Sequence, residues 1–163
     1  TWVGFLLKSV PFVMSNVEAD PTGRYILVTG RLHNTPVILL NVYAPNWDDS
    51  SFFTALFTQL PNMDTHHFIM GGDMNCNFSS LDCSPSSPFS LSKSARAIKT
   101  FLDTYKIIDI WRFHNPTSRS YSFFSQVHKT YSRMDYFFLD MHLLHLVTGC
   151  EYQAIVISDH AQW

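Results

Sequence analysis

The sequence has few charged residues, few cysteines and no long hydrophobic run. Charged residues make up 15% of the 163 positions, whereas apolar residues make up 46% and aromatic residues 15%, a composition that excludes a disordered chain. The longest aliphatic or aromatic runs, such as 37–40, fall far short of the roughly 18 residues that a membrane span needs, so we expect no membrane partner. Three cysteines, Cys76, Cys83 and Cys150, cannot close a set of disulfides and match no zinc spacing, which favours an intracellular location, nuclear or cytoplasmic.

The sequence also has only two glutamates, Glu18 and Glu151, and no methionine at its start. A chain of 18.8 kDa is long enough for one domain and too short for two ordinary ones, so we expect one partial domain over 1–163, cut from a longer protein.

A net charge of −2 gives no general sign of a nucleic-acid partner. The distribution of charge is more informative, because residues 93–133 contain eight basic and two acidic side chains, and the rest contain three basic and 11 acidic ones. This pattern fits a phosphate ligand near a cation site, although helix faces carry such clusters routinely.

Apolar periodicity predicts alternating strands and helices. Adjacent antiparallel strands are expected at 25–33 and 37–43, and helices at 52–60 and 91–105, the first of them capped within 48–51. The opening residues 1–14 are also expected to contribute to a strand. Further strands are expected at 67–70, 107–111, 120–125, 131–139 and 152–157, and a long polar loop is expected over 75–90. The predicted class is α/β, with two stacked, mixed and mostly antiparallel sheets flanked by helices.

Polar side chains follow two of the predicted strands, in Gly71-Gly72-Asp73-Met74-Asn75 and in Ser158-Asp159-His160. Asp73 and Asn75 are two positions apart, a spacing that can turn a carboxylate and an amide toward one point, although both residues are also common turn formers. Asp135 lies in a strongly apolar segment, where a carboxylate needs a partner such as His160 unless it points to solvent.

Other candidate ligands have simpler interpretations. His66 and His67 are adjacent in a strand and point to opposite faces, so we expect no shared ion. His142 and His145 lie three positions apart without an evident third ligand. Cys76 is expected to be a packing residue rather than a nucleophile.

Four motifs occur in order along the chain: Asn41-Val42-Tyr43-Ala44-Pro45-Asn46, Gly72-Asp73-Met74-Asn75, Ser132-Arg133-Met134-Asp135-Tyr136 and Ser158-Asp159-His160. In this combination the sequence resembles the exonuclease/endonuclease/phosphatase superfamily, the group of deoxyribonuclease I and the abasic-site endonucleases. The segments 121–125 and 128–133 are most similar to the endonuclease domain of LINE-type, non-LTR retrotransposon polyproteins. The resemblance implies a four-layer α/β/β/α sandwich that here lacks its first strands.

The resemblance also implies an activity, a Mg²⁺-dependent DNA endonuclease that nicks one strand, with Mn²⁺ as an alternative ion. Asp73 would orient and deprotonate the attacking water, Asn75 would hold the scissile phosphate, and Tyr43 would support the phosphate and leaving group. Asp135 would pair with His160, and Asp159 and His160 would lie at the metal. Positions that contact the nucleic acid or shape the site correspond to Asn46, Ser122, Ser132 and Arg133. Fusion to a reverse transcriptase and a monomeric state are implied as well.

The sequence departs from the family at two places. Family members carry an Asn and a metal-binding Glu on strands upstream of Thr1, and neither glutamate here has that context. An Arg of retrotransposon relatives corresponds to Cys83. Two alternatives therefore stay open: a phosphatase or phosphodiesterase of the same superfamily, acting on lipids, inositol phosphates or RNA tails, and a truncated, catalytically silent remnant that at most binds nucleic acid.

Overall fold

Two tight connections build the first half of the main sheet. The computed structural model describes residues 11–152. In it, β1 (Phe12–Ala19) pairs with β2 (Tyr25–Leu32) and β2 pairs with β3 (Thr35–Tyr43), both antiparallel. His33 and Asn34 close the β2–β3 hairpin with φ of 47° and 71°, the backbone region that a two-residue turn of this hand requires. The predicted antiparallel pair is confirmed.

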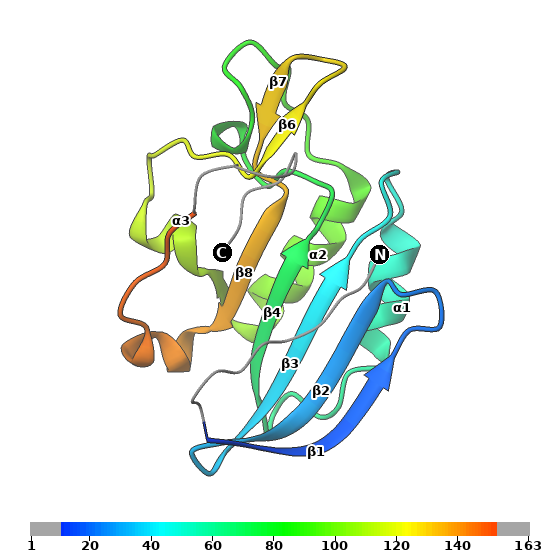
Figure 1. Cartoon of the computed structure of the whole chain (residues 1–163), viewed down its shortest axis with the longest axis vertical. Helices are drawn as coiled ribbons and strands as arrows, with labels where there is room; N and C mark the ends of the chain where they lie inside the picture. The colour runs from blue at the N-terminus through cyan, green and yellow to red at the C-terminus, as the bar shows by residue number, and fades with distance from the viewer. Residues whose placement is uncertain (1–10, 153–163) are drawn as a thin grey trace.

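The second half of the sheet is assembled from strands that are distant in sequence. β4 (His67–Asp73) pairs parallel with β3, because the chain crosses over through α1 (Ser50–Thr58). β8 (Asp135–Asp140) is antiparallel to β4, and β5 (Ile107–Asp109) is antiparallel to β8. The resulting order is β1-β2-β3-β4-β8-β5 (Figure 1).

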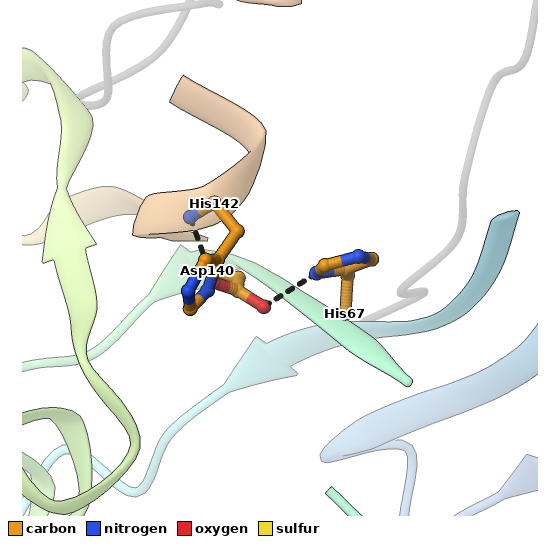
Figure 2. Close-up of side chains that lie close together, drawn as sticks. All are labelled: His67, Asp140 and His142. Atoms are coloured by element: carbon orange, nitrogen blue, oxygen red, sulfur yellow. Dashed lines mark hydrogen bonds and ion pairs between the residues drawn. The ribbon is translucent and has the colours of Figure 1, made fainter. Parts of the chain in front are cut away.

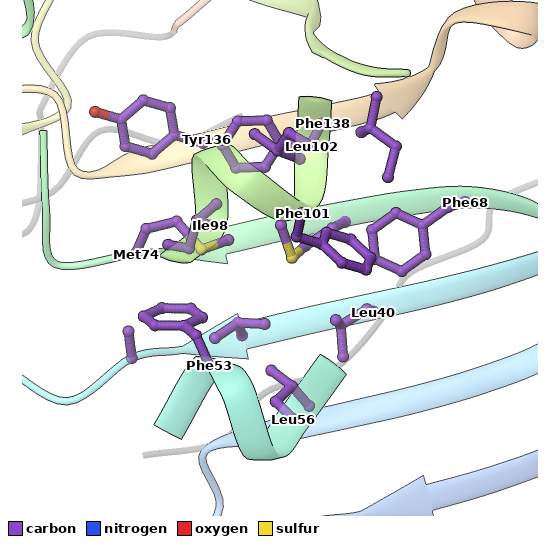
Figure 3. Packing of buried hydrophobic residues seen from close by; sticks show 14 of the residues in the cluster. Leu40, Phe53, Leu56, Phe68, Met74, Ile98, Phe101, Leu102, Tyr136 and Phe138 are labelled. Atoms are coloured by element: carbon purple, nitrogen blue, oxygen red, sulfur yellow. The ribbon is translucent and has the colours of Figure 1, made fainter. Parts of the chain in front are cut away.

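Helices cover one face of this sheet. α1 and α2 (Lys93–Tyr105) lie side by side there, as predicted, and their apolar residues meet alternate residues of the central strands (Figures 1 and 3). Phe68 of β4 packs with Phe101 of α2, whose ring stacks on Phe57 of α1 with centroids 3.9 Å apart. A smaller cluster around Val37 and Leu39 lies on the opposite face of the sheet.

The remaining elements are short. β6 (Phe123–Ser125) and β7 (Thr130–Ser132) form a separate two-stranded sheet near the start of β8 (Figure 1), and α3 (Ile110–His114) follows β5 directly. Two 3₁₀ segments, η1 (Ser80–Asp82) and η2 (Met141–Leu146), complete the described part. The α/β class with a mixed main sheet and a second sheet is confirmed, and no helix within 11–152 is long and apolar enough to cross a membrane.

Three predicted strands need correction. The strand expected at 107–111 ends at Asp109, because the Asp109 carboxylate accepts the Arg112 N–H and caps α3. The strand expected at 131–139 is divided into β7 and β8, which belong to different sheets and are separated by Arg133 and Met134. The strand expected at 120–125 is limited to β6. The strands expected within 1–10 and after Tyr152 lie outside the described residues.

Candidate active site

Three strand ends bring Tyr43, Asp73 and Asp135 into one row. Tyr43 of β3 is the register partner of Asp73 of β4, and Asp73 is the register partner of Asp135 of β8. Directly paired residues project from the same face of a sheet, with Cβ atoms about 5 Å apart. Their sequence neighbours Val42 and Tyr136 belong to the core beneath the helices, so the row faces the other way. The sheet thus places a phenol and two carboxylates side by side.

Gly72 is required for the approach of β3 to β4 beside this row. Its φ is 125°, a backbone region that side-chain-bearing residues rarely adopt. A Cβ at this position would collide with the Val42 carbonyl oxygen and lie 2.8 Å from Asn41 Oδ1. The glycine therefore allows the Asn41 side chain to lie against β4 at Gly72.

Asn75 and Asp73 are brought together, as their spacing suggests. The Asn75 backbone N–H donates to Asp73 Oδ1 at 2.9 Å, in a turn where Asn75 has a φ of 48°. The Asn75 side-chain amide donates to the Ala44 carbonyl oxygen at 2.9 Å, and the Ala44 N–H donates to the Asp73 carbonyl oxygen at 2.8 Å. These bonds fix Asp73, which is only 8% exposed, against the end of β3.

Ser122 and Ser132 hold the start of β8. The Ser122 side chain is fully buried, and its hydroxyl oxygen accepts the backbone N–H groups of Met134 and Asp135, both at 2.9 Å. The Ser122 N–H in turn donates to the Ser132 carbonyl oxygen at 3.0 Å. The Tyr152 hydroxyl donates to the Asp135 carbonyl oxygen. Ser122 thus shapes the site from within rather than offering its side chain to a ligand.

Arg133 lies away from this surface, which does not agree with the expected DNA contact. Its side chain is 1% exposed; Nε donates to Asp82 Oδ1 at 2.9 Å, and the guanidinium also pairs with Asp109. Burial alone would lower the pKa of the guanidinium, but the hydrogen bond and charge of Asp109 hold it above its ordinary value. Arg133 therefore anchors the β7–β8 connection, next to a cavity of about 470 Å³ whose lining includes neither Asp73 nor Asp135.

Arg24 and Trp47, which were not predicted from the sequence, lie near Tyr43. The Arg24 guanidinium carbon lies 5.3 Å from the centroid of the Tyr43 ring and 5.7 Å from that of Trp47, and Arg24 Nη1 donates to the Ala44 carbonyl oxygen. Trp47 is 60% exposed and directly follows the exposed Asn46, the last residue of the motif 41–46. This position was the feature of the sequence from which a role for Trp47 could have been predicted. A cation and an open indole face thus border the row.

Asp159 and His160 lie outside the described residues, so the structure does not place the expected pair of Asp135 and His160.

Cys76 is buried beside the proposed site. Burial, and to a smaller extent the nearby carboxylates, raise the pKa of its thiol to about 12. A thiol that stays protonated in this way is suited to packing rather than to nucleophilic attack.

Comparisons with known proteins show which sequences this chain is similar to. No family model matches the sequence. Over 155 residues it is 25% identical to the Transposon TX1 uncharacterized 149 kDa protein of Xenopus laevis, a match that covers 92% of this chain and 12% of that protein. The chain therefore corresponds to a small part of its curated relative.

Solved structures with a similar fold are nucleases and a phosphatase. The 3′ phosphatase NExo from Neisseria, bound to a product DNA hairpin, has a TM-score of 0.73 at 19% identity and covers 92% of this chain and 69% of its own. The AP endonuclease LMAP from Leishmania major has a TM-score of 0.68 at 21% identity, with coverages of 85% and 53%. The endonuclease domain of TRAS1, a telomere-specific non-LTR retrotransposon, has a TM-score of 0.61 at 17% identity, with coverages of 90% and 64%. The chain shares its fold with these three enzymes, so the fold that the resemblance implied is confirmed.

Proposed function

We propose that this chain is the catalytic core of a DNA endonuclease that nicks one strand by phosphodiester hydrolysis. The observation that carries the proposal is the row formed by Tyr43, Asp73 and Asp135, with Asn75 bonded to Asp73 at the same edge. The similarity of the chain to a transposon protein, and of its fold to that of a retrotransposon endonuclease, supports the assignment of a DNA endonuclease. We extend the proposal to a monomeric domain of a polyprotein that also carries a reverse transcriptase.

The groups of the row suit the steps of phosphodiester hydrolysis. We assign Asp73 as the base that orients and deprotonates the attacking water, and its contact with the Asn75 N–H helps to hold the carboxylate in place. Asn75 and Tyr43 contact the scissile phosphate and support its developing charge. Asp135 orients the imidazolium of His160, which donates a hydrogen bond to a non-bridging phosphate oxygen.

A divalent cation fits the donors at this edge. Asp73 and Asp135 are direct register partners, so strand pairing brings two carboxylates to the same edge of the sheet. The amide oxygen of Asn41 and the carboxylate of Asp159 are the hard donors that Mg²⁺ prefers and that Mn²⁺ also accepts, and we assign His160 a place beside the ion. When bound, the ion supplies positive charge to the leaving oxyanion.

The surface beside Tyr43 favours nucleic acid over a lipid or inositol phosphate. Trp47 offers an exposed indole on which a base can stack, and Arg24 places a positive charge between Trp47 and Tyr43. Asn46 adds an exposed amide that can bond to the phosphate backbone.

Plasmid nicking tests the proposal. The purified chain should convert supercoiled plasmid to the open circle with Mg²⁺ or Mn²⁺ and should leave it intact with a chelator. Salt-dependent DNA binding without nicking in any divalent metal would overturn the proposal in favour of the silent remnant. The fold is also similar to that of a 3′ phosphatase, so the second candidate function is a phosphatase. Release of phosphate from a 3′-phosphorylated oligonucleotide would test it.

A further inference from the structure

A second cluster of metal-binding side chains lies at the far end of the sheet. His67 begins β4, Asp140 ends β8, and His142 lies in the first turn of η2 (Figure 2). β4 has seven residues, so His67 lies about 20 Å along the strand from Asp73. This cluster is therefore separate from the proposed active site and does not depend on its function.

Asp140 lies between the two imidazole rings. Its Oδ2 atom lies 2.7 Å from His67 Nδ1, and its Oδ1 atom lies 2.8 Å from His142 Nδ1 (Figure 2). One ligand atom from each of the three residues lies within 4.8 Å of the others. The three side chains therefore converge on one point.

The Asp140 carboxylate is held in one orientation. It caps η2, where Oδ1 also accepts the His142 backbone N–H at 2.9 Å. A carboxylate that is oriented by such a hydrogen bond is prepared to ligate an ion.

We propose that His67, Asp140 and His142 bind Zn²⁺. Two imidazoles and one carboxylate form a donor set that suits Zn²⁺ and is poorly matched to Mg²⁺, which takes oxygen ligands. In the hydrogen-bonded cluster each neutral ring carries its hydrogen on Nδ1, toward Asp140. When the metal binds, that hydrogen passes to Nε2 through solvent and Nδ1 presents its lone pair to the ion, so the ring loses no net proton. The ligand atoms then settle about 3.3 Å apart around a tetrahedral ion.

The surroundings leave the site open to metal and water. The His142 side chain is 72% exposed, which leaves room for water in the fourth position of the ion. A cavity of about 440 Å³ adjoins the cluster and is also lined by Asp64, His66 and Lys106. The carboxylate of Asp64 favours a cation there and the ammonium of Lys106 opposes one. The bound ion would tie η2 to the β4–β8 pair.

Titration with Zn²⁺ tests the site. Isothermal calorimetry on the whole chain should show one Zn²⁺ site that persists in saturating Mg²⁺, which occupies the proposed active site and is a poor match for this donor set. His142→Ala removes an exposed ligand and should weaken Zn²⁺ binding more than about tenfold, since even residues that only support a metal ligand contribute that much. His128→Ala, at an exposed position in the β6–β7 turn, is the matched control and should bind as the wild type does.

Stability gives a second measurement. Zn²⁺ should raise the thermal unfolding midpoint of the wild type and of His128→Ala, and should leave that of His142→Ala unchanged. Absence of Zn²⁺ binding by the wild type, or equal affinity in His142→Ala, overturns the proposal and leaves the cluster as a hydrogen-bonded clamp.

Discussion

Single residues determine the backbone conformation of the proposed active site, in part through positive φ angles that most residues rarely adopt. Gly72 and Asn75 have positive φ values on either side of Asp73, and the Asn75 amide ties this turn to the end of β3. On the neighbouring strand, the buried Ser122 hydroxyl accepts the N–H groups at the start of β8. The carboxylates of Asp73 and Asp135 therefore depend in part on neighbours, Gly72 and Ser122, that do not themselves reach a substrate.

Ser122→Ala tests this dependence at the scale of one residue. Removal of the hydroxyl leaves two buried N–H groups without their acceptor, which should lower the free energy of unfolding by about 1–3 kcal/mol. The value of kcat for plasmid nicking should fall with KM unchanged, because the buried side chain touches no DNA. Nicking kinetics and urea unfolding provide the two readouts.

Two further variants make this test specific. Ser122→Thr keeps an acceptor oxygen and should restore most of kcat, while Ser118→Ala, at an exposed position, should change neither quantity. If Ser122→Ala shows the predicted decrease in the free energy of unfolding but an unaltered kcat, Ser122 supports only the fold and not catalysis.

The sequence predicted local residue relationships better than distant ones. Asp73 and Asn75 were recognised from their spacing, because both lie in one turn. Arg133 was expected at the DNA, but its partners Asp82 and Asp109 are 51 and 24 positions away, and burial of a charge has no local signal. For His67, only the adjacent His66 was considered as a partner for a shared ion, whereas its partners Asp140 and His142 follow much later in the chain.

At the scale of elements, α2 is joined to the loop that carries Asn46 and Trp47. Asp48 in this loop accepts the backbone N–H groups of Lys93 and Ser94 at 3.0 and 2.8 Å. These donors belong to the first turn of α2, where helical N–H groups lack internal partners. The position of the loop beside Tyr43 is thus coupled to a core helix.

Asp48→Ala should therefore destabilise the protein by about 1 kcal/mol at neutral pH, as is typical for loss of a capping carboxylate. The hydrogen bonds from Ser94 and Lys93 lower the pKa of Asp48 below 3.8, so its contribution is present above pH 3.8 and is lost as the pH falls through the lowered value. Urea unfolding at pH 7 and near pH 3 should show the difference from the wild type shrinking in acid.

Asp103→Ala removes an exposed carboxylate from the same helix and is the control for Asp48→Ala. It should have a small effect at both pH values. A deficit in Asp48→Ala that stays constant down to pH 3 would contradict the assigned role of the Asp48 carboxylate.

Element prediction succeeded where the apolar pattern was uninterrupted. The β2–β3 hairpin and both long helices follow directly from their periodicity. It failed where one polar residue redirects the chain: Asp109 starts a helix, and Arg133 separates β7 from β8. In both cases a hydrogen bond or ion pair from the side chain outweighs the strand tendency of the neighbouring residues.

At the scale of the whole molecule, the sheet order decides which residues meet. Tyr43, Asp73 and Asp135 come together because β4 runs parallel to β3 and antiparallel to β8, a pairing that no local pattern specifies. The same topology places His67, Asp140 and His142 at the other end of the β4–β8 pair. The molecule thus has two polar clusters at opposite ends of one sheet, and we assign nuclease chemistry to the first and Zn²⁺ binding to the second.

The most direct test of the nuclease assignment is the nicking rate of Asp73→Asn with Mg²⁺ present, measured beside the wild type and Asp103→Asn. We expect a loss of about 10²-fold or more for Asp73→Asn, the usual contribution of a catalytic base, with Asp103→Asn close to the wild type. Circular dichroism should show that both variants fold. A folded Asp73→Asn variant that nicks plasmid at the wild-type rate would rule out Asp73 as the catalytic base.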